Sequence, residues 1–185
     1  MRRSIILTVL LLAVTSVCFG SDYQYTIYYH TKGDSAAGAK LVAASNQQAT
    51  DGFDSEDRWT GSVPDGILVG IHKTNGTDGW DGTTGFYVND VRPAPTQGGT
   101  TTIDNIYVWA SSGLPSQNMH LHLDSAPQIG ADATCKLYLV SVPNGVTYNG
   151  PTEWTIPHGD IVLPFYSTND GTTGYKFRIE ITAAQ

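Results

Sequence analysis

Cysteine and basic residues are both scarce in this chain of 185 residues, and each shortage narrows what the protein can be. There are two cysteines, Cys18 and Cys135, and 10 lysines and arginines stand against 17 aspartates and glutamates, for a formal net charge of −7. So few cysteines exclude a small disulfide-braced fold, and a hydrophobic core must supply the stability. The excess of negative charge makes nucleic acid and anionic lipid poor partners, because both are negatively charged themselves.

The sequence also lacks an apolar run long enough to cross a bilayer as a helix. Residues 1–20 instead have the three parts of a secretory signal peptide, with Arg2 and Arg3, an apolar run over 5–14, and small residues before Ser21. We therefore expect a secreted, extracellular or cell-surface protein with no membrane span, formed by residues 21–185 as one domain. Loss of the two arginines would move the formal net charge from −7 to −9.

Strand signals recur along residues 21–185. The clearest is the segment 175–181, in which Tyr175, Phe177, Ile179 and Ile181 alternate with charged residues, as a sheet with one buried and one wet face requires. Turn-forming glycine, proline, asparagine and aspartate separate these segments. The pattern predicts an all-β fold, an antiparallel two-sheet β-sandwich of the Ig-like or jelly-roll-like kind. The other expected strands are 23–29, 67–72, 86–91, 103–110, 118–123, 135–142 and 161–165.

Two further local patterns carry predictions. The pentapeptide Asp-Gly-Thr-Thr-Gly occurs at 81–85 and again at 170–174, each time before an aromatic-rich strand. Asp-Gly favours tight turns between strands, so we interpret both copies as hairpin turns and not as a sign of duplication. A short helix is expected over 36–44, although Gly38 weakens that expectation.

The segment Ala-Thr-Asp-Gly-Phe-Asp at 49–54, followed by Asp57 and Pro64, resembles a signature of extracellular bacterial β-sandwich modules of the Ig or fibronectin-III-like kind. Asp90-Val-Arg92, a strand containing Trp109, and an apolar strand that ends at Asp124 follow in the same order. The resemblance covers most of residues 23–183. It implies a non-catalytic module of the type usually found at the C-termini of secreted or surface proteins.

The densest group of carboxylates is Asp51, Asp54, Glu56 and Asp57. Calcium takes six to eight oxygen ligands in flexible loops and would offset the repulsion between these charges, so the group is a candidate calcium site. The spacing is not that of an EF-hand. A solvated acidic turn, in which Asp51 bonds to the backbone, is the alternative reading.

His120 and His122 lie two residues apart on an expected strand, so their side chains would share one face of a sheet. Two histidines are the beginning of a zinc site, and His30, His72 or His158 would have to complete it. The alternative is that the pair simply belongs to the wet face of the strand.

Three tryptophans, Trp59, Trp80 and Trp154, fall in segments that read as loops. Loop tryptophans can stack on sugar rings, and they can equally anchor a loop against the sandwich. No nucleophile motif of the Gly-x-Ser-x-Gly kind occurs, and Cys135 alternates with leucines as a buried residue would. The sequence therefore predicts that the protein is not an enzyme.

Two functions remain in competition. The first is an extracellular structural or adhesive protein, in which the chain assembles with itself or with other surface proteins into a filament or matrix. The expected N-terminal strand, with Tyr23, Tyr25, Ile27 and Tyr29 on one face, could complete a neighbouring subunit's sheet, or could fold back into its own domain. The second is a carbohydrate-binding module that holds polysaccharide through the loop tryptophans.

Overall fold

The computed structural model of the chain describes residues 23–30, 40–46, 58–59, 67–77, 80, 84–93, 95–110, 118–125, 133–156 and 158–185. The expected signal peptide at 1–20 lies outside these ranges. For β1, β2 and β3, and for some residues of other strands, only the backbone is described. The described chain consists of strands and one short 3-10 turn, η1. Their bounds are β1 Tyr23–His30, β2 Lys40–Asn46, β3 Arg58–Trp59, β4 Ile67–Lys73, β5 Gly85–Pro93, β6 Thr100–Ala110, β7 Met119–Ser125, β8 Ala133–Ser141, β9 Glu153–Ile156, β10 Gly159–Leu163, η1 Gly171–Thr173 and β11 Tyr175–Ala183.

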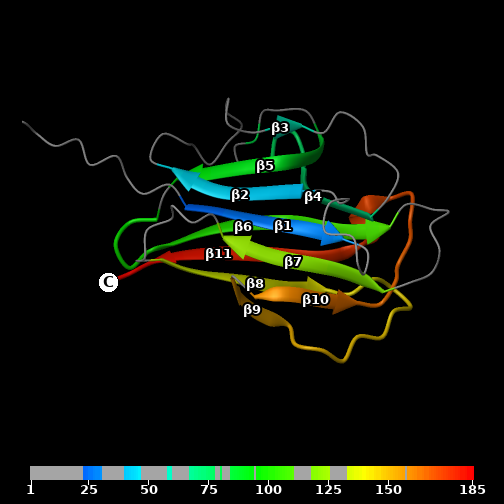
Figure 1. Ribbon diagram of the computed structural model, residues 1–185. Helices are drawn as coiled ribbons and strands as arrows, with labels where there is room; N and C mark the ends of the chain where they lie inside the picture. The colour runs from blue at the N-terminus through cyan, green and yellow to red at the C-terminus, as the bar shows by residue number, and fades with distance from the viewer. Residues whose placement is uncertain are drawn as a thin grey trace, which may run out of the picture.

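The strands form two antiparallel layers that are joined along one side (Figure 1). Six strands make the larger layer, in the order β5-β4-β6-β11-β8-β9, and the smaller layer has the order β2-β1-β7-β10. A parallel pairing of β2 with β5 links the layers, from Val42↔Asn89 to Asn46↔Pro93. The all-β sandwich predicted from the sequence is thus confirmed, with this one parallel pair as a departure from purely antiparallel pairing.

The core lies between the two layers. Alternation along β11 sends Phe177 and Ile179 inward, and both are almost fully buried. From the smaller layer, Leu121 of β7 and Ile161 of β10 belong to the same buried cluster. The cluster also contains Cys135, so the free thiol is a core residue, as its alternation with leucines predicted. Burial of this kind is worth about 1.5–3 kcal/mol for each large aliphatic or aromatic side chain.

Three local predictions were wrong. The helix expected over 36–44 is contradicted where the structure describes it, because Lys40–Asn46 is strand β2, paired with β1 and β5. Hydrogen bonds on both edges override weak helix propensity. Trp154 was assigned to a loop but lies in β9, and Trp59 was assigned to a loop but lies in the two-residue strand β3.

The second copy of the repeated pentapeptide is not a hairpin turn either. It connects β10 of the smaller layer to β11 of the larger one, as a capped 3-10 turn in which Asp170 accepts a hydrogen bond from the Thr172 N–H at 3.0 Å. Gly171 packs this turn against Trp109 and Phe86. Residues 81–83 of the first copy lie outside the described ranges.

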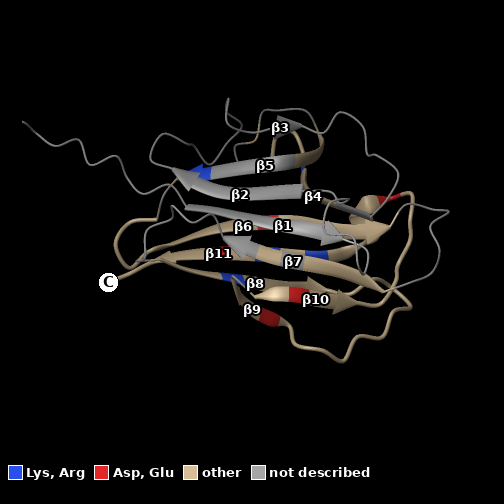
Figure 2. Ribbon diagram, in the orientation of Figure 1, with Lys and Arg blue, Asp and Glu red and all other residues tan. Residues whose placement is uncertain are grey.

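Figure 2 shows described residues of both charge signs spread over several strands and turns, and two ion pairs join Lys136 to Glu153 and Arg178 to Glu180. Within the same residues, no helix has the length and apolar character needed to cross a membrane.

Candidate functional site

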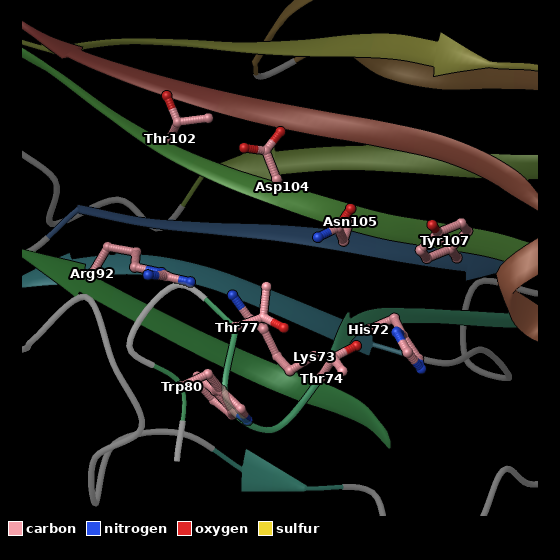
Figure 3. A pocket seen from close by; sticks show the side chains of 10 residues that line it. All are labelled: His72, Lys73, Thr74, Thr77, Trp80, Arg92, Thr102, Asp104, Asn105 and Tyr107. Atoms are coloured by element: carbon pink, nitrogen blue, oxygen red, sulfur yellow. The ribbon is translucent and has the colours of Figure 1, made fainter. Parts of the chain in front are cut away.

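A cleft of about 530 Å³ lies where β6 extends beyond the end of β4. The pairs between β4 and β6 run from Ile71↔Ile106 to Ile67↔Ala110, so among the described strands residues 100–103 of β6 pair with β11 alone, and residues 104 and 105 lie at a break in that pairing. The cleft occupies the space beside that unpaired edge. Figure 3 shows the β6 side chains in one row and the other lining side chains across from them. The β6 row consists of Thr102, Asp104, Asn105 and Tyr107, and the opposite wall of His72, Lys73, Thr74, Thr77, Trp80 and Arg92.

A β-bulge shapes the β6 row. The β6 to β11 register shifts so that Ile103 pairs with Ile179 and Ile106 pairs with Phe177, which leaves two β6 residues opposite one on β11. Asn105 is the extra residue and adopts a left-handed backbone, with φ 59°. Among residues other than glycine, asparagine tolerates this conformation well. The bulge resets the alternation, so Ile103 and Ile106 both face the core.

The same bulge exposes the polar residues of the row. Asp104 is exposed, and Asn105 and Tyr107 are half-buried. Bulges and left-handed residues other than glycine are often found at binding sites, where they aim side chains that a regular strand would direct elsewhere. Thr101 donates a hydrogen bond from its hydroxyl to the Pro93 carbonyl at 2.8 Å, which ties β6 to the end of β5 beside the cleft.

The opposite wall is built on a buried aromatic pair. Trp80 is 2 % exposed and meets Tyr87 edge-on, with ring centroids 4.8 Å apart. The Lys73 ammonium lies 5.1 Å from the centre of the Trp80 ring, a cation–π contact. Lys73 is itself 9 % exposed, so the contact holds a largely buried cation at the edge of the cleft. Arg92 of β5 supplies a second cation on this wall.

The two ionisable rings of the cleft are uncharged near neutral pH. Burial lowers the pKa of His72, and the negative charge of Asp170 only partly opposes that shift. Burial raises the pKa of Tyr107, and Asp170 raises it further. The imidazole and the phenol can therefore each donate one hydrogen bond and accept another. Their rings lie edge to face, with centroids 6.4 Å apart.

The structure places two of the predicted ligand-binding tryptophans in buried positions. Trp80 forms the base of the cleft wall just described, and Trp154, 4 % exposed, belongs to the main core in β9. Neither offers an open ring face on which a sugar could stack, because neighbouring side chains cover both rings. The side chain of Trp59 lies outside the described residues, although its backbone is part of β3.

His120 and His122 both lie on β7, as predicted. The Nδ1 of His120 is 3.9 Å from a carboxylate oxygen of Asp160 on β10, and the His122 side chain lies outside the described residues. Among the side chains that are described, no three of His, Cys, Asp or Glu come together to hold a metal ion. The zinc pair therefore gains no third ligand in this part of the chain.

The carboxylates of the candidate calcium site, Asp51, Asp54, Glu56 and Asp57, all lie outside the described residues. Calcium binding there stays a prediction. It would raise the melting temperature in saturating calcium relative to chelator, and equal melting temperatures would refute it.

The candidate assembly strand β1, which carries Tyr23, Tyr25, Ile27 and Tyr29, lies in the middle of the smaller layer. It pairs with β2 on one edge and with β7 on the other. Both of its edges are therefore occupied within the same chain. Donating β1 to a neighbour would require breaking two strand pairings.

Sequence reasoning missed the cleft altogether. One signal was present, because Ile103 and Ile106 are three residues apart in a segment that otherwise alternates, and Asp104-Asn105 between them are poor strand formers. That pattern is typical of a bulge. The position of Arg92 across from them depends on long-range pairing, which no local pattern reports.

Comparisons with known proteins return no match, whether with family models, with curated proteins or with solved structures. The resemblance to extracellular bacterial modules rests on its sequence motifs, of which the segment 49–54 lies outside the described residues.

Proposed function

We propose that this chain is a non-catalytic extracellular protein that works by adhesion, and that the cleft beside β6 is its recognition site. The observation that carries the proposal is the placement of Asp104 and Asn105 by a bulge, on a framework of paired strands, opposite Lys73 and Arg92. Rigid strands that line a cleft with polar groups are typical of binding sites. The signal-peptide pattern of residues 1–20 supports the extracellular location.

The test uses beads coated with the purified protein and a panel of immobilised polysaccharides, immobilised surface proteins and the protein itself. The double variant Asp104→Asn with Asn105→Gly removes the negative charge of Asp104 and the amide side chain of Asn105, and glycine accepts the left-handed backbone without strain. The matched control is Thr134→Ala, an exposed residue of β8 that does not line the cleft. We expect retention on at least one surface that the control keeps and the double variant loses. Equal retention by both variants, or none by the unaltered protein, refutes the proposal.

A second candidate, self-assembly into filaments or a matrix, is favoured by the open side of the sandwich. In the described sheet, β9 and β10 are the outermost strands, and only residues 157 and 158 separate them in sequence. The Leu139 N–H bonds to the Thr152 carbonyl at 2.9 Å, so by the alternation of an antiparallel ladder the N–H and C=O groups of Thr155 point away from β8. Such an edge can add a strand from a second copy.

Replacing Thr155 by proline tests this edge, because proline removes the outward N–H and leaves the β8 to β9 bonds in place. Thr155→Val keeps the N–H and is the control. Light scattering after size exclusion, with negative-stain imaging, should find oligomers for the unaltered chain and the valine variant and monomers for the proline variant. Monomers in all three refute assembly through β9.

A further inference from the structure

We infer that the ligand of the cleft is a carbohydrate, bound through the hydroxyls of a neutral sugar ring. This inference rests on the proposed function, since it names the ligand class of the same site. It differs from recognition by exposed loop tryptophans, because the two described candidates are buried and the sugar would be held by polar groups on β4, β5 and β6.

The hydrogen-bonding chemistry of the two walls matches a polyhydroxylated ligand. The Asp104 carboxylate only accepts hydrogen bonds, whereas the Asn105 amide both donates and accepts. Across the cleft, Lys73 and Arg92 only donate, and Arg92 has five N–H groups, enough for more than one partner. A sugar hydroxyl donates and accepts at once, so neighbouring hydroxyls of one ring can satisfy both walls. Thr77 and Thr102 add hydroxyls of the same dual character.

Other ligand classes fit the described groups less well. An anion would meet Asp104 as well as Lys73 and Arg92, and a cation would meet Lys73 and Arg92 as well as Asp104, so neither finds a lining of one sign. An apolar ligand would form no hydrogen bond with the polar groups of either wall, and covering polar groups without a hydrogen bond is unfavourable. A neutral hydroxylated ring can use the donors and the acceptors of this lining together.

The aromatic end of the cleft suits a sugar ring as well. His72 is uncharged near neutral pH and Tyr107 remains protonated, for the reasons of burial given above. A half-buried ring of each type can contact the C–H face of a sugar while its polar atom bonds to a hydroxyl. The ammonium of Lys176 lies 5.9 Å from the centre of the Tyr107 ring on the neighbouring strand β11 and helps to fix that ring.

The site is also formed in advance of binding. The bulge fixes Asp104 and Asn105 through the backbone, and the hydrogen bond from Thr101 to Pro93 closes the end near Arg92. A volume of about 530 Å³ lies within the usual range for ligand sites, roughly 300–1,000 Å³. Because little needs to be ordered on binding, weak hydrogen bonds can add up to measurable affinity.

The experiment uses the isotope-labelled protein of residues 21–185, without the expected signal peptide. It is titrated with soluble neutral oligosaccharides of gluco, manno and galacto configuration, with a uronic-acid oligosaccharide, and with a free amino acid as a small charged probe. Backbone amide shifts report where each probe binds, and the shifts give the dissociation constant. We expect at least one neutral oligosaccharide to shift amides of residues 100–107. Asp104→Asn and Asn105→Gly should each weaken that binding by about 3- to 30-fold, as expected for the loss of one or two hydrogen bonds. Thr134→Ala should leave it unchanged.

Three results would overturn the inference: saturable binding of the charged probes alone, binding of no probe, or sugar binding that neither cleft variant weakens. Circular dichroism melting of each variant checks that it is folded. The bead panel distinguishes failure of the carbohydrate inference from failure of the proposed function. If the beads are retained on a protein surface, the cleft variant abolishes that retention and no sugar binds, then the carbohydrate inference is refuted and the proposed adhesive site is supported.

Discussion

Replacement of Gly171 by alanine should destabilise the protein through a clash with two aromatic rings. An added Cβ would lie 2.6 Å from Cζ2 of Trp109 and 2.7 Å from Cζ of Phe86, whereas carbon atoms in contact normally lie about 3.5–4.0 Å apart. The two rings already pack against each other with centroids 4.6 Å apart, and Trp109 is 3 % exposed. Because Trp109 is buried and Phe86 packs against it, room for the new methyl group requires at least one of the two rings to shift.

The expected magnitude follows from two opposing terms. Overpacking of this kind costs about 1–3 kcal/mol. Gly171 does not have a positive φ, so alanine suits its backbone and restores about 0.4–1 kcal/mol by restricting the unfolded chain. The midpoints of the two ranges leave a net loss of about 1.3 kcal/mol, which in a chain of this size lowers the melting temperature by roughly 3–5 °C.

Thermal unfolding followed by circular dichroism measures this loss. The control is Thr172→Ala, which removes a hydroxyl bonded to Asp170 at 2.6 Å and adds no atom near the rings. We expect the Gly171 variant to melt at a clearly lower temperature than the Thr172 variant. If it melts at the same or a higher temperature, the turn does not press on the two rings as described.

Three further predictions concern the core. Burial raises the pKa of Tyr175 to about 12, and its hydroxyl donates to the Pro164 carbonyl at 2.8 Å. An unfolded tyrosine ionises near pH 10, so the contribution of Tyr175 to the free energy of unfolding is complete below about pH 10 and is lost as the pH rises toward 12. Urea unfolding should therefore show a smaller loss of this free energy between about pH 10 and 12 for Tyr175→Phe than for the unaltered chain. Equal losses would contradict this prediction. Burial also raises the pKa of Cys135, so a thiol-reactive dye should leave Cys135 unlabelled in the native protein and react with it once urea unfolds the chain, whereas rapid native labelling of Cys135 would contradict its core position. Leu137→Ala, at a fully buried site, should cost about 2–5 kcal/mol in urea unfolding, and a loss under about 1 kcal/mol would mean that the site is loosely packed.

The strands and their inward faces were predictable because they depend on short-range alternation. The segment 175–181 gave the correct buried face of β11, since its apolar residues repeat with period two along seven residues. Strand β2 was missed because its alanine-rich sequence has little strand propensity, and its conformation depends on pairing with β1 and β5. Strand β9 was missed because it has only four residues.

The cleft could not be predicted for a different reason. Its two walls come from Lys73, Arg92 and the bulge at Asn105, and their meeting depends on how β4, β5 and β6 diverge in space. The prediction that the tryptophans lie in open loops failed for a physical reason as well. A polar, glycine-rich neighbourhood such as that of Trp80 is common in loops, yet the ring packs on Tyr87 beneath a lysine. Local composition reports the neighbours in sequence and not those in space.

The central position of β1 in the smaller layer limits how early in synthesis this layer can form. Tyr25 pairs with Ser125, so β1, the first of the described strands to leave the ribosome, has no β7 partner until residue 125 has been synthesised. Pairings of such long range form slowly, on a scale of milliseconds to seconds in all-β domains. Until β7 has been synthesised, the aromatic-rich β1 is exposed to non-native association. A chaperone that binds β1 should therefore raise the yield of folded protein.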